Sequence, residues 1–81
     1  MESKRTERRR NQYLQLGLTI GYYRKLKGMT QGELAKAVGL SRTHVSNLEA
    51  PRMETSISLD KLFDIADVLG VPVMKLFDFR D

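Results

Sequence analysis

The chain has 81 residues, a hydrophobic fraction of 41% and a formal net charge of +4. This length holds one small domain with a modest core, which favours a compact helical bundle and excludes two separate folded domains. With no cysteine and one histidine, disulfide frameworks and the usual zinc sites are excluded, so we expect no metal. The length leaves no room for a separate small-molecule sensor domain, so we expect no small-molecule ligand and no other cofactor. Apolar runs are too short to span a membrane and the N-terminus is charged, which predicts a cytoplasmic protein without membrane contact.

The charge is divided unevenly along the chain. Residues 1–52 contain 11 Lys and Arg against 4 Asp and Glu, a net of +7, whereas residues 53–81 contain 3 against 6, a net of −3. A basic half joined to an acidic half indicates that one face of the domain binds a polyanion. The alternative is an asymmetry that arose by chance, as it does in many soluble domains. Residues 1–12 are almost all polar. We expect them to form a basic arm or a frayed extension of the first helix, serving solubility or phosphate contact, with residues 13–81 as the folded domain.

The first helix is expected from Tyr13 to Lys27. Gly17 and Gly21 are expected to weaken it, and Gly28 to end it. The apolar residues that recur at helical spacing are Leu16, Ile20, Tyr23 and Leu26.

Two short helices follow. Thr30 and Glu33 are spaced as a capping box, so one helix begins here and ends before Gly39. Ser41 is placed to cap the next helix, from Arg42 to Glu49.

A loop at residues 50–57 separates these helices from the C-terminal part. Ser58 caps a strongly amphipathic helix that Gly70 ends, and Pro72 opens a last short helix. The residues expected to face inward are Leu59, Leu62, Ile65, Ala66 and Leu69. No segment alternates with period two for long enough to form a strand, so the sequence predicts five helices and no sheet.

The segment 31–50 carries the most informative pattern. Ala35 is small enough for two helix backbones to approach there, and Gly39, four residues later, can adopt the positive φ of a tight turn. Val45 and Leu48 then anchor the second helix in the core. This spacing is typical of a helix-turn-helix.

The second helix of this unit presents a distinctive outer face. Because Val45 and Leu48 point inward, the exposed residues are Arg42, Thr43, His44, Ser46 and Asn47. These side chains suit DNA base edges, where arginine pairs with guanine, asparagine with adenine, and threonine contacts the thymine methyl group. The simpler interpretation is a polar solvated face. For His44 the alternatives are a phosphate contact, a pH-sensitive group or a plain exposed residue.

The chain from Ile20 to Phe77 resembles the phage-repressor-like helix-turn-helix family, the class of the lambda repressor and Cro. The resemblance implies a compact all-α, five-helix domain that binds operator DNA, usually as a dimer. The matching residues are Ile20, Tyr23-Arg24, Gly28-Met29-Thr30-Gln31, Glu33-Leu34-Ala35, Val38-Gly39-Leu40-Ser41, Val45-Ser46, Leu48-Glu49, Ser58-Leu59, Leu62, Ile65-Ala66 and Leu69-Gly70-Val71.

The resemblance also implies roles for single residues. Gln31 would contact a phosphate and brace the recognition helix, and Arg24 and Glu49 would form an inward ion pair. Family members often have Asn-Gly or Arg-Gly after the position of Glu49, whereas this chain has Ala50-Pro51. Because proline has no amide hydrogen, we expect Arg52 to supply the phosphate contact. The residues expected to face the major groove are Arg42, Thr43, Ser46 and Asn47.

These observations predict a sequence-specific regulator of transcription that binds double-stranded DNA as a homodimer on an inverted repeat. The dimer is expected through Leu76, Phe77 and Phe79, which so small a chain struggles to bury. Nothing places a nucleophile beside a base, so we expect no catalysis. The alternatives are an antitoxin-like or adaptor protein that binds a partner through Leu76–Phe79, and an RNA-binding module that uses Arg8–Arg10. Restriction–modification controllers and antitoxins are small members of the resembled family.

Overall fold

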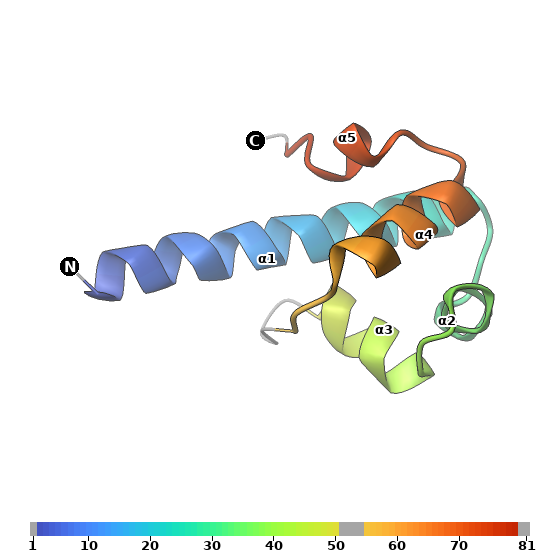
Figure 1. The fold of residues 1–81 in the computed structure, drawn as a ribbon, viewed down its shortest axis with the longest axis horizontal. Helices are drawn as coiled ribbons and strands as arrows, with labels where there is room; N and C mark the ends of the chain where they lie inside the picture. The colour runs from blue at the N-terminus through green and yellow to red at the C-terminus, as the bar shows by residue number, and fades with distance from the viewer. Residues whose placement is uncertain (1, 51–54, 80–81) are drawn as a thin grey trace.

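The computed structural model describes residues 2–50 and 55–79, which form five α-helices and no strand. The helices are α1 (Glu2–Leu26), α2 (Gln31–Val38), α3 (Arg42–Glu49), α4 (Leu59–Leu69) and α5 (Val73–Leu76). The expectation of an all-α, five-helix fold is confirmed (Figure 1).

Helix α1 is longer than the sequence predicts. It runs without a break through residue 12, so residues 2–12 continue the helix that was expected to begin at Tyr13. The side chains of Lys4 and residues 6–12 are exposed, and this half of α1 extends beyond the other helices (Figure 1).

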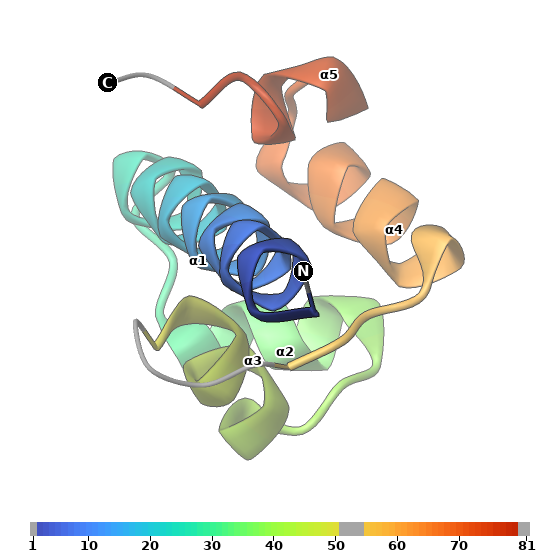
Figure 2. The same cartoon turned by 90° about the vertical axis from the view of Figure 1, so that its left-hand side faces the viewer.

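The remaining helices pack around the second half of α1. Figure 2 looks along α1 and shows α2 and α3 on one side of it, with α4 and α5 on another. All five helices contribute to one core. Its fully buried side chains are Ile20, Leu34, Val45, Ile65 and Leu76.

Two leucines of the predicted apolar patterns are exposed, and one of them, Leu59, was expected to face inward. Leu26 lies ten residues after Leu16, and at 100° per residue this places it about 80° around the helix from the buried row; it is 69% exposed. Leu59 is the first residue of α4, and at this end of the helix it is 66% exposed. The prediction that Leu59 faces inward is therefore wrong, and Leu26 lies apart from the buried residues of α1.

Candidate nucleic-acid interface

Gly39 forms the tight turn between α2 and α3. Its φ of 72° and ψ of 33° are left-handed, a conformation that a residue with a Cβ adopts only at a cost. The amide groups of Gly39 and Leu40 both donate to the carbonyl of Ala35, which closes α2. The direction of α3 is thereby set within the three residues between Val38 and Arg42.

Helix α3 is fixed by its cap and by its inner face. The Ser41 hydroxyl accepts a hydrogen bond of 3.0 Å from the His44 amide, which satisfies one of the free amide groups of the first turn. Val45 is completely buried and Leu48 nearly so. This face therefore packs in the core, and the opposite face is left for a ligand.

The outer face of α3 carries the four residues expected to read bases. Arg42 and Thr43 are exposed, and Ser46 and Asn47 are partly exposed. At 100° per residue the four positions span about 140° of the helix, opposite Val45 and Leu48. The Arg42 side chain passes close to Gly32 in the first turn of α2: a Cβ built on that glycine would lie 3.7 Å from Arg42 Cδ. The structure thus brings all four residues to one surface.

The ring of His44 contacts the loop before α4. Its Nε2 lies 3.2 Å from the carbonyl oxygen of Ser56, and because a carbonyl can only accept, Nε2 carries the hydrogen in this contact. The side chain is partly exposed and connects α3 to the loop before α4. Arg52, the other residue of this region expected to contact phosphate, lies outside the described residues.

An ion pair joins α1 to the end of α3. Arg24 donates through Nε to Glu49 Oε2 at 2.7 Å and through Nη2 to Glu49 Oε1 at 2.9 Å, a bidentate arrangement. Its Nη1 donates to the carbonyl of Met29 at 2.6 Å. Gln31, at the start of α2, donates through Nε2 to Glu49 Oε1 at 3.1 Å. Helices α1, α2 and α3 therefore meet at one carboxylate.

This carboxylate is well shielded from water. The side chains of Arg24 and Glu49 are each 8% exposed. The hydrogen bond to Glu49 raises the pKa of Arg24 above its ordinary value, although burial acts in the opposite direction. Arg24 therefore stays charged and holds Glu49 in place.

Comparison with known proteins identifies the fold family. A family model described as helix-turn-helix matches residues 20–76, which is more than half of the chain. The chain belongs to the helix-turn-helix family. More specifically, its structural neighbours are lambda-repressor-like helix-turn-helix regulators.

Several relatives of this family are regulators of transcription. An uncharacterised HTH-type transcriptional regulator from Methanocaldococcus jannaschii is 37% identical over 62 residues, which cover 76% of this chain and 91% of the relative. The transcriptional regulator SinR of Bacillus subtilis is 35% identical over 63 residues, which cover 78% of this chain and 56% of SinR. The chain thus spans just over half the length of SinR.

Two solved structures show the same fold. The restriction–modification controller protein C.AhdI of Aeromonas hydrophila matches with a TM-score of 0.76 and 26% identity, covering 84% of this chain and 96% of that one. SinR in complex with DNA matches with a TM-score of 0.70 and 35% identity, covering 78% and 98%. The resemblance to the lambda repressor class is therefore confirmed.

Two glycines of α1 determine how closely α3 approaches, whereas the sequence indicated only that they weaken the helix. A Cβ on Gly17 would overlap the carbonyl oxygen of Leu48, and a Cβ on Gly21 would lie 3.1 Å from the Glu49 carboxylate. The end of α3 thus lies directly against the backbone of α1. The available signal was the pair of glycines four residues apart within an otherwise regular helix, a spacing that places both on one face.

Lys61 is a third residue whose role the sequence did not indicate. This side chain of α4 donates a hydrogen bond to the carbonyl of Val38 at the end of α2. A cation is favourable at a helix C-terminus, where carbonyl groups lack partners. The contact therefore helps to fix α2 against α4.

The three residues expected in a dimer interface differ in how much of each is exposed to solvent. Leu76 is completely buried in the core, so a second copy cannot contact it and its expected place in the interface is wrong. Phe77 is 49% exposed, Phe79 is partly buried, and their ring centroids lie 6.4 Å apart. Only these two of the three residues retain surface for a partner.

Neither a metal cluster nor a membrane span is found in the part of the chain that the structure describes. No group of three or more His, Asp or Glu side chains there is arranged to hold an ion. Helix α1, the longest described, is too polar to cross a bilayer, and the other described helices are too short.

Proposed function

We propose that this protein is a transcriptional regulator that recognises a specific operator by placing α3 in the major groove of DNA. The observation that carries the proposal is the outer face of α3. Arg42, Thr43, Ser46 and Asn47 share this face while Val45 and Leu48 anchor the helix in the core. A rigidly held helix with short polar side chains suits the reading of base edges.

Arg42 is the strongest candidate for base recognition. It lies in the first turn of α3 and is exposed, and this end of a recognition helix contacts the bases in related motifs. Its guanidinium can donate twice to the N7 and O6 acceptors of guanine. Thr43, Ser46 and Asn47 would contact neighbouring base pairs.

Phosphate contacts would come from residues beside the recognition helix. Gln31 uses one amide hydrogen for Glu49, and its second hydrogen can donate to a phosphate oxygen. Gln31 would therefore hold the Glu49 carboxylate and contact DNA at the same time. His44 and Arg52 would add further phosphate contacts.

We further propose a homodimer on an inverted repeat. Phe77 and Phe79 are the apolar side chains with which the C-terminal end of the domain would contact a second copy. Two recognition helices related by this symmetry would enter successive major grooves, about 34–36 Å apart. The DNA complex of SinR supports the binding of DNA by this fold.

Selection from random duplex DNA tests the proposal. The full chain is incubated with a random library, and the enriched sequences are measured by titration against unselected DNA and single-stranded RNA. We expect an enriched inverted repeat bound at least a thousandfold more tightly than random DNA. Equal binding of all duplexes would show that the protein does not recognise a specific sequence. A preference for RNA would favour an RNA-binding module. Weak binding of both DNA and RNA would favour a protein-interaction module.

A further inference from the structure

The first half of α1 carries a concentration of positive charge that the proposed function does not use. Residues 2–12 contain five Lys and Arg against two Glu, a net of +3. The described side chains of this segment are exposed, and the helix continues here past α3 and the rest of the bundle (Figure 1). The matched helix-turn-helix region begins later, at residue 20. Neither core packing nor the shared fold therefore accounts for this charge.

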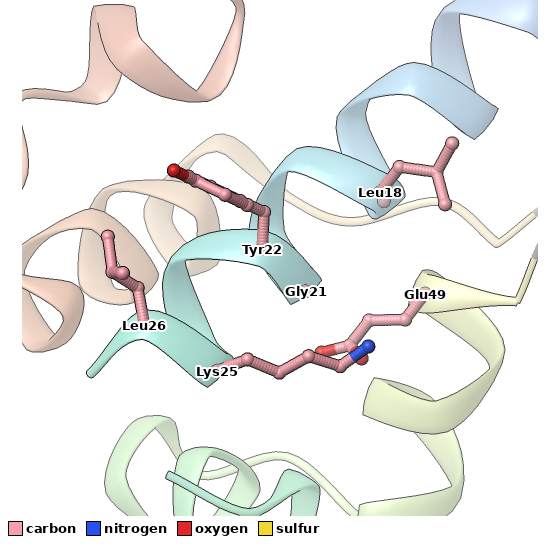
Figure 3. A pocket seen from close by; sticks show the side chains of 7 residues that line it. Leu18, Gly21, Tyr22, Lys25, Leu26 and Glu49 are labelled. Atoms are coloured by element: carbon pink, nitrogen blue, oxygen red, sulfur yellow. The ribbon is translucent and has the colours of Figure 1, made fainter. Parts of the chain in front are cut away.

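Two glycines mark the face of α1 that contacts α3. A Cβ on Gly17 would overlap the carbonyl oxygen of Leu48. Gly21, one turn later, lies beside the Glu49 carboxylate (Figure 3). Arg10 lies seven residues before Gly17 and eleven before Gly21, which at 100° per residue puts it between them around the helix. Arg10 is therefore on the side of α1 that faces α3.

Arg8 lies on the opposite side of the helix. It is nine residues before Gly17, which is half a turn away around the axis. Both arginines are exposed, and they are only two positions apart in the chain. Arg10 already has an intramolecular interaction, and the five N–H donors of a guanidinium group leave others for a second acceptor.

The position of Arg10 along α1 places it beside the groove that α3 would occupy. Seven residues span about 10 Å of helix, so Arg10 lies that far along α1 from the contact between Gly17 and α3. The major groove is about 12 Å wide. If α1 crosses the groove, a cation about 10 Å from the helix inside it lies over the phosphates at the edge.

The composition of the segment favours a phosphate backbone as its ligand. A helix that lies on a lipid surface needs an apolar face, and residues 2–12 contain no apolar residue. Duplex DNA carries one negative charge per about 1.7 Å of its axis. The duplex bound by α3 therefore presents phosphates wherever it continues past the groove.

We propose that the first half of α1 binds the DNA backbone, with Arg10 in contact with a phosphate beside the groove that α3 occupies. The inference rests on the proposed function, because α3 positions the duplex. Arg8, on the far side of the helix, adds only long-range attraction that salt screens. The contact reads no base, so it raises the affinity for operator and random DNA alike.

The salt dependence of binding separates the two arginines. Arg10→Gln and Arg8→Gln remove the same charge from exposed positions of one helix, and glutamine has a helix propensity close to that of arginine. On the selected operator, Arg10→Gln is expected to reduce the slope of log K against log salt by about 0.9 per bound chain, and the affinity about fivefold at physiological salt. Arg8→Gln should reduce the affinity by less than about twofold.

Phosphate ethylation locates the contact. Ethylation of one phosphate beside each half-site should interfere with binding of the original chain and of Arg8→Gln, and should not affect Arg10→Gln. Arg10→Lys should retain this interference, because a phosphate also accepts hydrogen bonds from an ammonium group. The selected motif should be the same for all four proteins. Circular dichroism confirms that the variants stay helical.

Three results would overturn the inference while a motif is still selected. Equal losses in Arg10→Gln and Arg8→Gln would leave only long-range attraction. An unchanged salt slope in Arg10→Gln would remove the phosphate contact. Tighter binding of single-stranded RNA than of the selected DNA, lowered by Arg10→Gln, would assign the segment to RNA. If the original chain selects no motif, the proposed function fails and this inference fails with it.

Discussion

Gly17 of α1 lies directly against the carbonyl group of Leu48 in α3, and no other residue type fits at this position without moving the backbone. Leu48 is followed by Glu49, which Arg24 holds from the same side of α1. The position of α3 therefore depends on the absence of a side chain at Gly17 and on the ion pair between Arg24 and Glu49.

Gly17→Ala is expected to destabilise the protein. The new Cβ would overlap a backbone oxygen, which cannot rotate away as a side chain can, and overpacking of this kind costs about 1–3 kcal/mol or more. The better helix propensity of alanine offsets only about 1 kcal/mol of this. Gly32→Ala is the matched control, because its Cβ meets nothing closer than 3.7 Å. In urea unfolding we expect opposite signs, and a stabilised Gly17→Ala protein would show that α3 does not approach α1 as described.

Glu49→Ala is expected to lower the free energy of unfolding by about 3–5 kcal/mol, because it leaves the buried Arg24 without its partner. Gln31 also loses its acceptor. Asp64→Ala, an exposed change on α4, should alter stability by less than about 0.5 kcal/mol. Chemical denaturation of both variants measures the difference, and equal midpoints would mean that the ion pair contributes nothing.

Arg42→Ala is expected to weaken binding by about 1–3 kcal/mol per half-site and to relax the preference at one base pair. Arg42→Lys should recover part of the affinity without the base preference, because an ammonium group lacks the planar fork of guanidinium. The DNA motifs selected by the original chain, by Arg42→Ala and by Arg42→Lys show whether Arg42 reads a base. Identical motifs with uniformly weaker binding would assign Arg42 to the phosphate backbone.

Gln31→Ala should show the opposite behaviour. Loss of a phosphate contact lowers affinity similarly on operator and random DNA, so the selected motif should not change. Loss of the hydrogen bond to Glu49 should cost about 1 kcal/mol of stability, which denaturation measures separately. A changed motif in a stably folded Gln31→Ala protein would show that Gln31 orients the base-reading residues.

Phe77→Asp is expected to weaken the proposed C-terminal dimer and to leave the core intact, since this ring is half exposed. Leu76→Ala is expected instead to unfold the domain more easily, by about 2–5 kcal/mol, because it creates a cavity in the core. Sedimentation measures the loss of the dimer in Phe77→Asp, and thermal unfolding measures the loss of stability in Leu76→Ala. A Phe77→Asp protein that dimerises as before would place the interface elsewhere.

Local chemistry in the sequence was sufficient to predict the helix-turn-helix. Thr30 and Glu33 form the predicted capping box with hydrogen bonds of 3.0 and 2.8 Å, and Gly39 has the predicted left-handed conformation. Caps and turns depend on residues within four positions of one another, so their spacing is visible in the chain. The buried positions Val45 and Leu48 follow from the same short-range periodicity.

Contacts between distant segments were decided only by the tertiary structure. The sequence showed Gly17 as a weak point of a helix, and only the packed chain shows Leu48 against it. It showed Leu26 in an apolar row, and only the orientation of α1 shows that this residue faces outward. Periodicity states which residues share a face of a helix, but the neighbouring elements determine which face is covered and how closely two backbones approach.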